Sequence, residues 1–222
     1  MSANTSPAVM AQRKEPHDSL DDFPTQPWAT RALLEWLKAG GEDLSLCACR
    51  EPAANRGHMV RPLQEYFGVV HASDVHNYGA GFEVNDYLFG PAPHPVDWTI
   101  TNPPFRLAEQ FIERALDTSE AGVAMLVRST FIEGVNRWWR LFSKRPPTHI
   151  LQFSERVLIL KGRLVKDGAI CPVLKRKVNT ATSFSWLVWK LPLTVPHQTR
   201  LEWIGPCRTS LTRPGDYHDN QP

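Results

Sequence analysis

Hydrophobic residues recur along most of this chain at spacings that alternate between helical and extended patterns. Residues 30–38 carry apolar side chains at helical spacing, and the glycines at 40 and 41 end this predicted helix. Further helices are predicted over residues 58–67 and 106–119. Short apolar runs predict strands over residues 44–49, 69–75, 96–101 and 122–127. Such alternation is typical of an α/β three-layer sandwich.

The last third of the chain has a different pattern. A predicted helix around Trp138 and Trp139 is broken by Pro146-Pro147. Strand-like runs then follow at residues 149–153, 157–160, 184–191 and 201–204. We expect these runs to include antiparallel partners. The predicted fold is a Rossmann-like α/β/α sandwich with a mostly parallel seven-stranded sheet and an antiparallel edge.

Composition favours a single domain. The 222 residues are 42% hydrophobic and 22% charged, which suffices for one substantial core. Residues 1–20 and 206–222 are polar, so a flexible arm and a flexible tail are predicted around a domain at residues 21–205. A cytoplasmic protein without membrane contact is expected, because no apolar run suits a bilayer span or a secretion signal. The four cysteines form no paired Cys-x-x-Cys motif, which favours buried thiols over a metal site.

Charge is unevenly distributed along the chain. The formal net charge is +2, from 25 basic and 23 acidic residues, yet residues 137–177 hold eleven basic and two acidic residues, a local charge of +9. Such a run is usually a solvated face, but an excess of this size also attracts polyanions through counterion release. We take residues 137–182 as the candidate substrate-binding segment. Its candidate residues are Arg137, Arg140, Lys161, Arg163, Lys166, Lys175, Arg176 and Lys177.

Candidate chemistry begins where the strand predicted at residues 96–101 ends, at Asn102-Pro103-Pro104-Phe105. Two prolines often follow a strand for a purely structural reason, because proline has no N–H to continue the hydrogen-bond ladder. A planar, weakly nucleophilic amino group must be bound by two hydrogen-bond acceptors and a flat apolar face before it can be methylated, and the same four residues can supply them. The Asn102 side-chain carbonyl and the Pro103 backbone carbonyl can accept its two N–H bonds, and Phe105 offers a flat apolar face. These four residues are the candidate catalytic residues for amino-group methylation.

A loop after the first predicted strand carries the next motif. Glu51-Pro52-Ala53-Ala54-Asn55-Arg56-Gly57 resembles the Glu-Pro-Ala-x-Gly-x-Gly loop that binds S-adenosylmethionine in amino-methyltransferases acting on DNA. Asn55 stands where that family usually has its first glycine. Asparagine is the non-glycine residue that best tolerates left-handed backbone angles, so we expect the loop to keep its shape.

Three more segments match the family in its own order. They are Phe23-Pro24-Thr25-Gln26-Pro27, the strand end at Asp74, and Asn85-Asp86-Tyr87-Leu88. The resemblance implies that Thr25 contacts the methionine carboxylate, Asp74 the ribose hydroxyls and Asp86 the adenine amino group of the cofactor. Glu51 either orients the methionine ammonium group or caps the following helical turn. The implied cofactor-binding residues are Thr25, Glu51, Pro52, Ala53, Asn55, Gly57, Asp74 and Asp86.

By these motifs the chain resembles class I S-adenosylmethionine-dependent methyltransferases, in particular short DNA adenine-N6 methyltransferases of phages and prophages. The resemblance implies S-adenosylmethionine as cofactor, DNA as partner, an adenine flipped out of the duplex and a short or relaxed recognition sequence. A monomer or homodimer is expected, without a metal.

Other functions remain open. RNA methyltransferases acting on guanine or adenine and protein-glutamine methyltransferases use a similar Asn-Pro-Pro-aromatic site, although Phe105 and the basic segment favour nucleic acid. A nucleic-acid-binding protein that has lost turnover is the alternative of another class, with Asn55 as its first sign of decay. Trp138 and Trp139 suit either stacking on bases or burial in the core.

Overall fold

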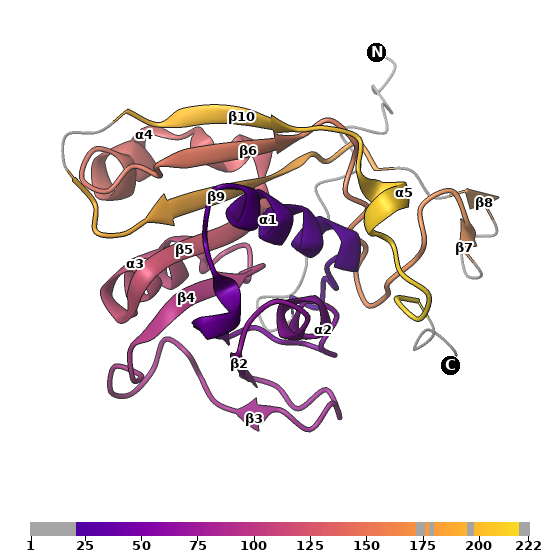
Figure 1. The fold of residues 1–222 in the computed structure, drawn as a ribbon, viewed down its shortest axis with the longest axis horizontal. Helices are drawn as coiled ribbons and strands as arrows, with labels where there is room; N and C mark the ends of the chain where they lie inside the picture. Colours follow the sequence, from indigo (N-terminus) through magenta and orange to yellow (C-terminus); the bar gives the residue numbers. More distant parts are fainter. Residues whose placement is uncertain (1–20, 172–175, 178–179, 195–197, 218–222) are drawn as a thin grey trace, which may run out of the picture.

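The central feature of the fold is an eight-stranded sheet with the strand order β10-β6-β9-β5-β4-β1-β2-β3 (Figure 1). A computed structural model describes residues 21–171, 176–177, 180–194 and 198–217. The strands of the sheet are β1 (Ala48–Glu51), β2 (Val69–Asp74), β3 (Glu83–Val84), β4 (Val96–Thr101), β5 (Ser119–Arg128), β6 (His149–Phe153), β9 (Phe184–Lys190) and β10 (Arg200–Ile204). A separate antiparallel pair consists of β7 (Ile170–Cys171) and β8 (Arg176–Lys177).

Most neighbouring strands of the sheet are parallel. Strands β5, β4, β1, β2 and β3 pair in parallel, and β10 pairs in parallel with β6. Strand β9 runs antiparallel to both of its neighbours, β5 and β6. The predicted Rossmann-like fold, mostly parallel with antiparallel pairing toward one edge, is therefore confirmed. The sheet has eight strands instead of the predicted seven.

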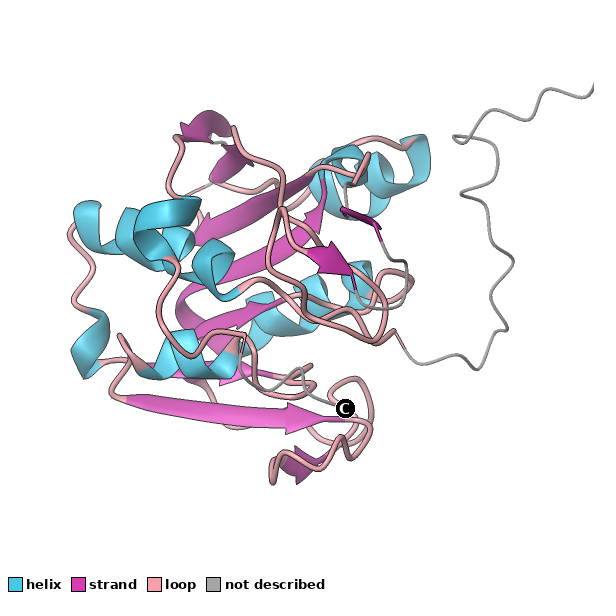
Figure 2. Cartoon of the chain, turned by 90° about the vertical axis from the view of Figure 1, so that its right-hand side faces the viewer, coloured by secondary structure: helices cyan, strands magenta, loops and turns pink. Residues whose placement is uncertain are grey.

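Helices cover both faces of this sheet (Figures 1 and 2). They are α1 (Pro27–Ala39), η1 (Leu44–Leu46), α2 (Val60–Gln64), α3 (Ala108–Thr118), η2 (Ser129–Ile132), α4 (Val135–Arg137), η3 (Trp138–Phe142) and α5 (Arg208–Leu211). The predicted helices over residues 58–67 and 106–119 are thus shorter than expected. Pro27 begins α1, where its missing N–H costs no intrahelical hydrogen bond.

Two hydrophobic cores sandwich the sheet, and β5 contributes to both. Ala124 and Leu126 belong to the core under α1, while Val123 and Met125 belong to the core under α3. All four are 0% exposed, because side chains alternate across a strand that is covered on both faces. Because both faces of this strand are buried, residues 122–127 are apolar at every position.

Two predicted strands differ from the structure. Residues 44–49 form η1 followed by the start of β1, so the strand begins at Ala48. The apolar run at 157–160 forms no ladder beyond an isolated bridge from Leu160 to Arg163. Val157 is nevertheless 0% exposed, and the Leu158 carbonyl accepts a hydrogen bond from Gln26 Nε2 at 2.7 Å. A side chain satisfies this buried backbone group, which sequence periodicity does not reveal.

The predicted flexible tail is also different. Residues 206–217 include α5 and pack against α1, where the Arg31 guanidinium binds Asp216 at 2.8 Å and the Leu211 carbonyl at 2.8 Å. Tyr217 Oη donates to Gln26 Oε1 at 2.8 Å. Buried polar side chains in α1 and directly before it therefore order this polar segment. The predicted arm at 1–20 and residues 218–222 lie outside the described residues.

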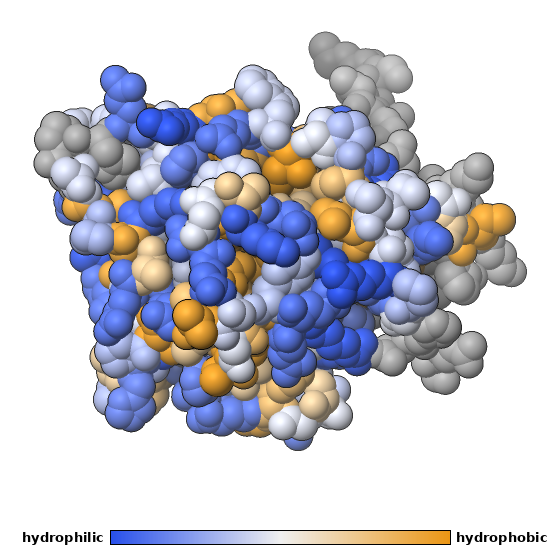
Figure 3. Space-filling view, viewed as in Figure 1, coloured by the Kyte–Doolittle hydropathy of each residue, from blue (hydrophilic) through white to orange (hydrophobic). Residues whose placement is uncertain are grey.

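The surface seen in Figure 3 is mostly hydrophilic, with apolar atoms in scattered patches. Exposed apolar side chains include Leu46 at the end of η1 and Phe89 in the loop after β3, which are far apart in the sequence. Isolated exposed apolar residues are normal in globular proteins. Within the described part of the chain, no helix has the length and apolar character needed to cross a membrane.

Candidate active site

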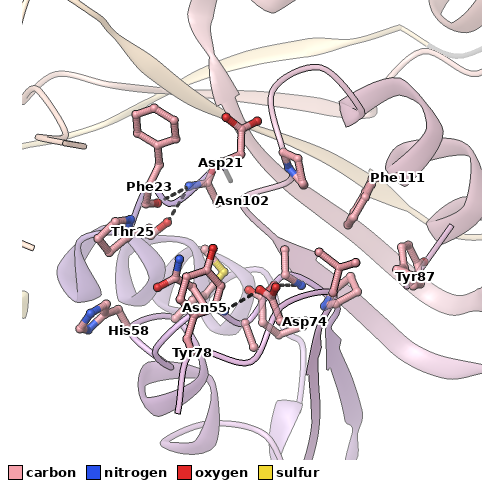
Figure 4. A pocket seen from close by; sticks show the side chains of 18 of the residues that line it. Asp21, Phe23, Thr25, Asn55, His58, Asp74, Tyr78, Tyr87, Asn102 and Phe111 are labelled. Atoms are coloured by element: carbon pink, nitrogen blue, oxygen red, sulfur yellow. Dashed lines mark hydrogen bonds between the residues drawn. The ribbon is translucent and has the colours of Figure 1, made fainter. Parts of the chain in front are cut away.

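A pocket lies at the carboxyl ends of β1, β2 and β4, where the strand order of the sheet reverses (Figure 4). This switch point is where open α/β sheets bind ligands. Seven of the eight predicted cofactor-binding residues line the pocket: Thr25, Glu51, Pro52, Ala53, Asn55, Asp74 and Asp86. Of the predicted catalytic residues, Asn102 and Pro104 line it. The fold therefore brings motifs that are far apart in the sequence to one cavity.

The loop after β1 has the backbone shape expected for a glycine-rich turn. Asn55 has φ of 50°, which is the left-handed conformation predicted for it. Gly57 has φ of 82°, and a Cβ atom there would lie 2.9 Å from Phe82 Cζ. Gly57 does not line the pocket, so its place in the motif is explained by backbone conformation and by the close approach of the Phe82 ring.

Glu51 is buried beneath this loop, with 1% of its surface exposed. Its Oε1 accepts hydrogen bonds from Thr101 Oγ1 at 2.5 Å and from the Ala53 backbone N–H at 2.9 Å. Burial raises the pKa of Glu51 to about 8, against the opposing effect of these two hydrogen bonds. Thr101 was missed by sequence reasoning. Its position as the last residue of β4, directly before Asn102, is the only sequence signal it carries.

Two aspartates lie at the pocket, Asp74 at the end of β2 and Asp86 after β3. Asp74, 9% exposed, accepts hydrogen bonds from the backbone N–H groups of Asn55 and His76, both at 2.9 Å. Asp86 is exposed and accepts one from the Leu88 N–H at 2.9 Å. Backbone amides thus fix both carboxylates, and each carboxylate oxygen has a second lone pair for a ligand.

Asn102 lies across the cavity from Asn55 and Asp74 (Figure 4). Its Nδ2 donates to the Phe23 carbonyl at 3.1 Å and to Thr25 Oγ1 at 3.0 Å. Its Oδ1 is buried and has no hydrogen-bond partner among the described residues. A buried acceptor without a partner costs about 1–3 kcal/mol, so such an atom calls for a functional explanation. Thr25, expected to contact the cofactor, also orients the Asn102 amide.

Phe105 lies outside the pocket, on the far side of the Asn-Pro-Pro-Phe loop. Its ring packs against Phe23 with centroids 4.8 Å apart, and the Arg128 guanidinium lies 4.4 Å from its centroid. The Phe105 N–H donates to Asp21 Oδ2 at 2.7 Å. Pro103 is buried within the same loop.

The segment of residues 21–25 connects the two loops of the site, and sequence reasoning assigned only Thr25 to it. The Asp22 carboxylate accepts hydrogen bonds from Asn55 Nδ2 at 2.8 Å and from the Arg56 guanidinium at 2.8 and 2.9 Å. Burial alone would raise the pKa of Asp22, but the hydrogen bonds from Arg56 and Asn55 hold it below its usual value. Since Asp21 holds Phe105, one short segment contacts both the loop after β1 and the loop after β4.

The basic residues of the predicted substrate-binding segment do not gather in one patch. Arg137 and Arg140 lie next to Phe105. The loop with Lys161 and Arg163 contacts the segment of residues 21–25 through a hydrogen bond from the Gly162 N–H to the Asp22 carbonyl at 2.7 Å.

The other predicted basic residues lie elsewhere. Lys166 lines a separate pocket beside α5. Arg176 and Lys177 form β8, and Lys175 lies outside the described residues. Trp138 and Trp139 are 53% and 65% exposed, so neither belongs to the core.

No metal site emerges in the described ranges, where no three His, Cys, Asp or Glu side chains cluster suitably. The pocket instead offers carboxylates, a carboxamide and backbone groups. These suit an organic ligand that carries hydroxyl, amino and cationic groups.

Known proteins resemble this chain in structure but not detectably in sequence. No protein-family model matches the sequence, and no curated protein matches it significantly. Among solved structures, a protein from Listeria monocytogenes assigned as a class I S-adenosylmethionine-dependent methyltransferase superposes with a TM-score of 0.58 at 14% identity, over 88% of this chain and 69% of that one.

Two further structures are similar. A protein from Pyrococcus horikoshii assigned as an RNA methyltransferase gives a TM-score of 0.55 at 17% identity, over 82% of this chain and 94% of that one. The modification subunit of a protein from Vibrio vulnificus YJ016 assigned as a type I restriction enzyme gives 0.52 at 12% identity, over 82% of this chain and 47% of that one. The chain therefore has the fold of these proteins.

Proposed function

We propose that this chain is an S-adenosylmethionine-dependent methyltransferase that methylates the exocyclic amino group of adenine in DNA. The observation that carries the proposal is the buried Asn102 Oδ1, which has no hydrogen-bond partner in the described part of the chain and lies at the edge of a pocket rich in carboxylates. An amino group that enters from the substrate side would supply the missing hydrogen bond.

The pocket fits the proposed cofactor in its polar groups. Asp74 and Asp86 offer carboxylate oxygens to ribose hydroxyls and to an adenine amino group, and Glu51 offers one to an ammonium group. S-adenosylmethionine supplies an electrophilic methyl group on a sulfonium centre. Carboxylates at Asp21, Asp74 and Asp86 also favour a ligand that carries positive charge.

Asn102 and Pro103 would activate the accepting nitrogen. The lone pair of an adenine amino nitrogen is delocalised into the ring, so the nitrogen is planar and a weak nucleophile. Hydrogen bonds to Asn102 Oδ1 and to the Pro103 carbonyl favour a tetrahedral nitrogen whose lone pair points to the methyl group. Positive charge develops on this nitrogen during transfer, and the two acceptors therefore bind the transition state more tightly than the ground state.

The surrounding residues hold Asn102 in the orientation that this role requires. Because the Phe23 carbonyl can only accept a hydrogen bond, a flip of the amide would place Oδ1 against that carbonyl oxygen. The carboxamide is therefore fixed before substrate arrives, which is the preorganisation that transition-state stabilisation needs. Phe105 and its neighbours would contact the base on the substrate side of the loop.

The loop after β1 supports an enzyme over a decayed scaffold. Asn55 keeps the left-handed turn, and its backbone and side chain are both hydrogen-bonded. The left-handed turn that we expect S-adenosylmethionine to need therefore does not depend on a glycine at this position. RNA and protein glutamine remain alternative substrates of the same chemistry.

Three measurements test this function. Calorimetry with S-adenosylmethionine should detect binding, and its absence at high micromolar cofactor would remove the enzyme hypothesis. Methylation-aware sequencing of DNA from cells that express the protein should reveal N6-methyladenine that is missing with Asn102→Ala. Transfer of a labelled methyl group should also be assayed with RNA and with protein. If methyl is transferred to one of these and not to DNA, that molecule is the substrate, and the proposal of adenine in DNA is wrong.

A further inference from the structure

A second pocket lies on the Phe105 side of the Asn-Pro-Pro-Phe loop, separate from the pocket of the proposed cofactor. It is lined by residues directly before and within α3, in η2, and in the region of α4 and η3. The lining includes Phe105, Arg106, Glu109, Phe131, Arg137 and Arg140. Three arginines against one glutamate leave an excess of two positive charges in a small space.

Arg137 is held in place within this pocket. Its guanidinium carbon lies 3.9 Å from the centroid of the Phe131 ring, and its NH1 donates to the carbonyls of Phe131 and Glu133, both at 2.6 Å. Stacking and two carbonyl contacts fix the plane of the guanidinium. A side chain ordered in this way loses little conformational entropy when it binds a ligand.

Glu109 shows which kind of group the pocket accepts. Arg140 donates to its carboxylate through Nε at 2.8 Å and through NH2 at 3.0 Å, and Arg137 Nε lies 3.3 Å from Glu109 Oε1. Hydrogen bonding from Arg140 lowers the pKa of Glu109. Arg140 thus already binds a pair of anionic oxygens, with Arg137 as a second ion-pair partner. A phosphodiester presents its two free oxygens with a similar geometry.

We propose that this pocket binds a backbone phosphate of a nucleic acid, next to the nucleotide presented to Asn102. The phosphate takes the place of the Glu109 carboxylate as the partner of Arg137 and Arg140. Phe105 belongs both to the catalytic loop and to the pocket, and Arg106 follows it directly, so a ligand bound there lies beside the substrate position. The inference rests on the proposed function and adds the site that recognises a polyanion.

Glu109→Gln and Asp117→Asn form a matched pair of variants for the test. Both residues lie on α3, each is paired with an arginine, and each substitution removes one negative charge. Asp117 binds Arg145 at 2.7 Å and lies eight residues from Glu109, which is roughly 12 Å along a helix. That distance exceeds the Debye length of about 8 Å at physiological salt, so the two charges act separately on a bound phosphate.

Fluorescence anisotropy with a duplex DNA oligonucleotide, and with an RNA of the same sequence, measures the binding. Glu109→Gln should tighten nucleic-acid binding about threefold to tenfold, because a competing carboxylate is removed, and Asp117→Asn should change it much less. Arg140→Gln should weaken binding and lower the salt dependence by about one released counterion, whereas Arg145→Gln should not. Cofactor affinity and melting temperature should stay close to those of the parent in the two carboxylate variants.

The results separate this inference from the proposed function. If the parent methylates nucleic acid but Glu109→Gln binds it no more tightly than Asp117→Asn, the phosphate site is wrong and the methyltransferase stands. If the parent transfers methyl only to protein, or binds no nucleic acid, the phosphate site is also wrong.

Discussion

The two sides of the Asn-Pro-Pro-Phe loop are built in different ways. On the side of the proposed cofactor pocket, which we call the cofactor side, Glu51 and Asp74 are buried and accept hydrogen bonds from backbone amides or from a neighbouring hydroxyl. On the Phe105 side, Arg140 is 61% exposed and pairs with Glu109, another long side chain. The first side is fixed mainly by backbone amides of the loops that follow β1 and β2. The second side depends more on ion pairs between long side chains, although Arg137 also binds two backbone carbonyls.

This difference separates two tasks. A single cofactor needs one fixed set of acceptors, which strand ends and tight turns supply at low entropic cost. A polymer substrate needs charge at a distance and groups that can exchange partners. Asn102 lies between the two sides, and it alone would contact the reacting nitrogen through its side chain.

The largest effect is expected from Asn102→Ala, which removes the link between the two sides. The rate constant of methyl transfer should fall about 100-fold to 1,000-fold, as for the loss of one preorganised hydrogen-bonding group in a transition state. Cofactor affinity should stay nearly unchanged, because Oδ1 is assigned to the substrate. Single-turnover transfer of labelled methyl and calorimetry measure the two quantities. A variant that transfers methyl at the parental rate would contradict the role of Asn102.

Asp74→Ala should affect the cofactor side alone. Loss of hydrogen bonds between a ligand and a charged group, about 1.5–3 kcal/mol, predicts a cofactor dissociation constant about 10-fold to 150-fold higher. The substitution also releases the Asn55 and His76 amides, so the melting temperature should be recorded with the calorimetric titration. Asp117→Ala, far from the pocket, is the control. An unchanged isotherm for Asp74→Ala would show that Asp74 does not hold the ribose.

Glu51 makes the cofactor side sensitive to pH. Its pKa is raised to about 8 in the folded chain, above its usual value of 4.5, so the folded state holds a proton that the unfolded state releases. The stability contributed by this proton is present in full below the unfolded value and is lost as the pH rises through about 8. Glu51→Gln should remove this loss, so the melting curves of the cofactor-free parent and the variant should diverge toward alkaline pH.

Cofactor binding should follow the opposite trend. An ammonium group prefers the ionised carboxylate, so affinity of the parent should rise with pH and level off above the pKa of about 8. Glu51→Gln should lack this rise. Calorimetry in buffers of different ionisation enthalpy would also register the proton that Glu51 releases. If affinity of both proteins follows the same pH curve, Glu51 does not face the ammonium group.

The cofactor side could be predicted from the sequence because its parts are local. A left-handed Asn55 and an aspartate at the end of β2 follow from short motifs, and the buried run in β5 follows from its composition. These features depend on residues close together in the chain. The mostly parallel sheet with an antiparallel edge was predicted as well, whereas the order of its strands came only from the structure.

The Phe105 side could not be predicted in the same way. The +9 segment suggested one basic patch, yet its members lie on different sides of the site and several are paired with acids. Asp21 and Asp22 reach the site only through tertiary contacts with Phe105 and with the turn at Asn55. Charge counts along a chain do not record which carboxylate lies opposite which arginine. The same limitation hid the docking of residues 206–217 on Arg31.

The smallest effect is expected at Asn55, where the two sides are joined through Asp22. Asn55→Gly removes the unfavourable φ of 50° but also loses the hydrogen bond to Asp22 at 2.8 Å, so the free energy of unfolding should change by less than about 1 kcal/mol. Asn55→Ala keeps the strained backbone without the hydrogen bond and should be less stable than Asn55→Gly by about 1–2 kcal/mol. Denaturant unfolding measures both.

The affinity of Asn55→Gly for S-adenosylmethionine then distinguishes between two explanations for the asparagine at this position. If Asn55 marks a decaying loop, the glycine should restore tighter binding of S-adenosylmethionine. If Asn55 fastens residues 21–25 to the loop after β1, the glycine should bring no gain in affinity, and methyl transfer should slow, because Phe23 and Thr25 would orient Asn102 less firmly. The second outcome is expected, since the Asn55 amide nitrogen and the Arg56 guanidinium share the Asp22 carboxylate.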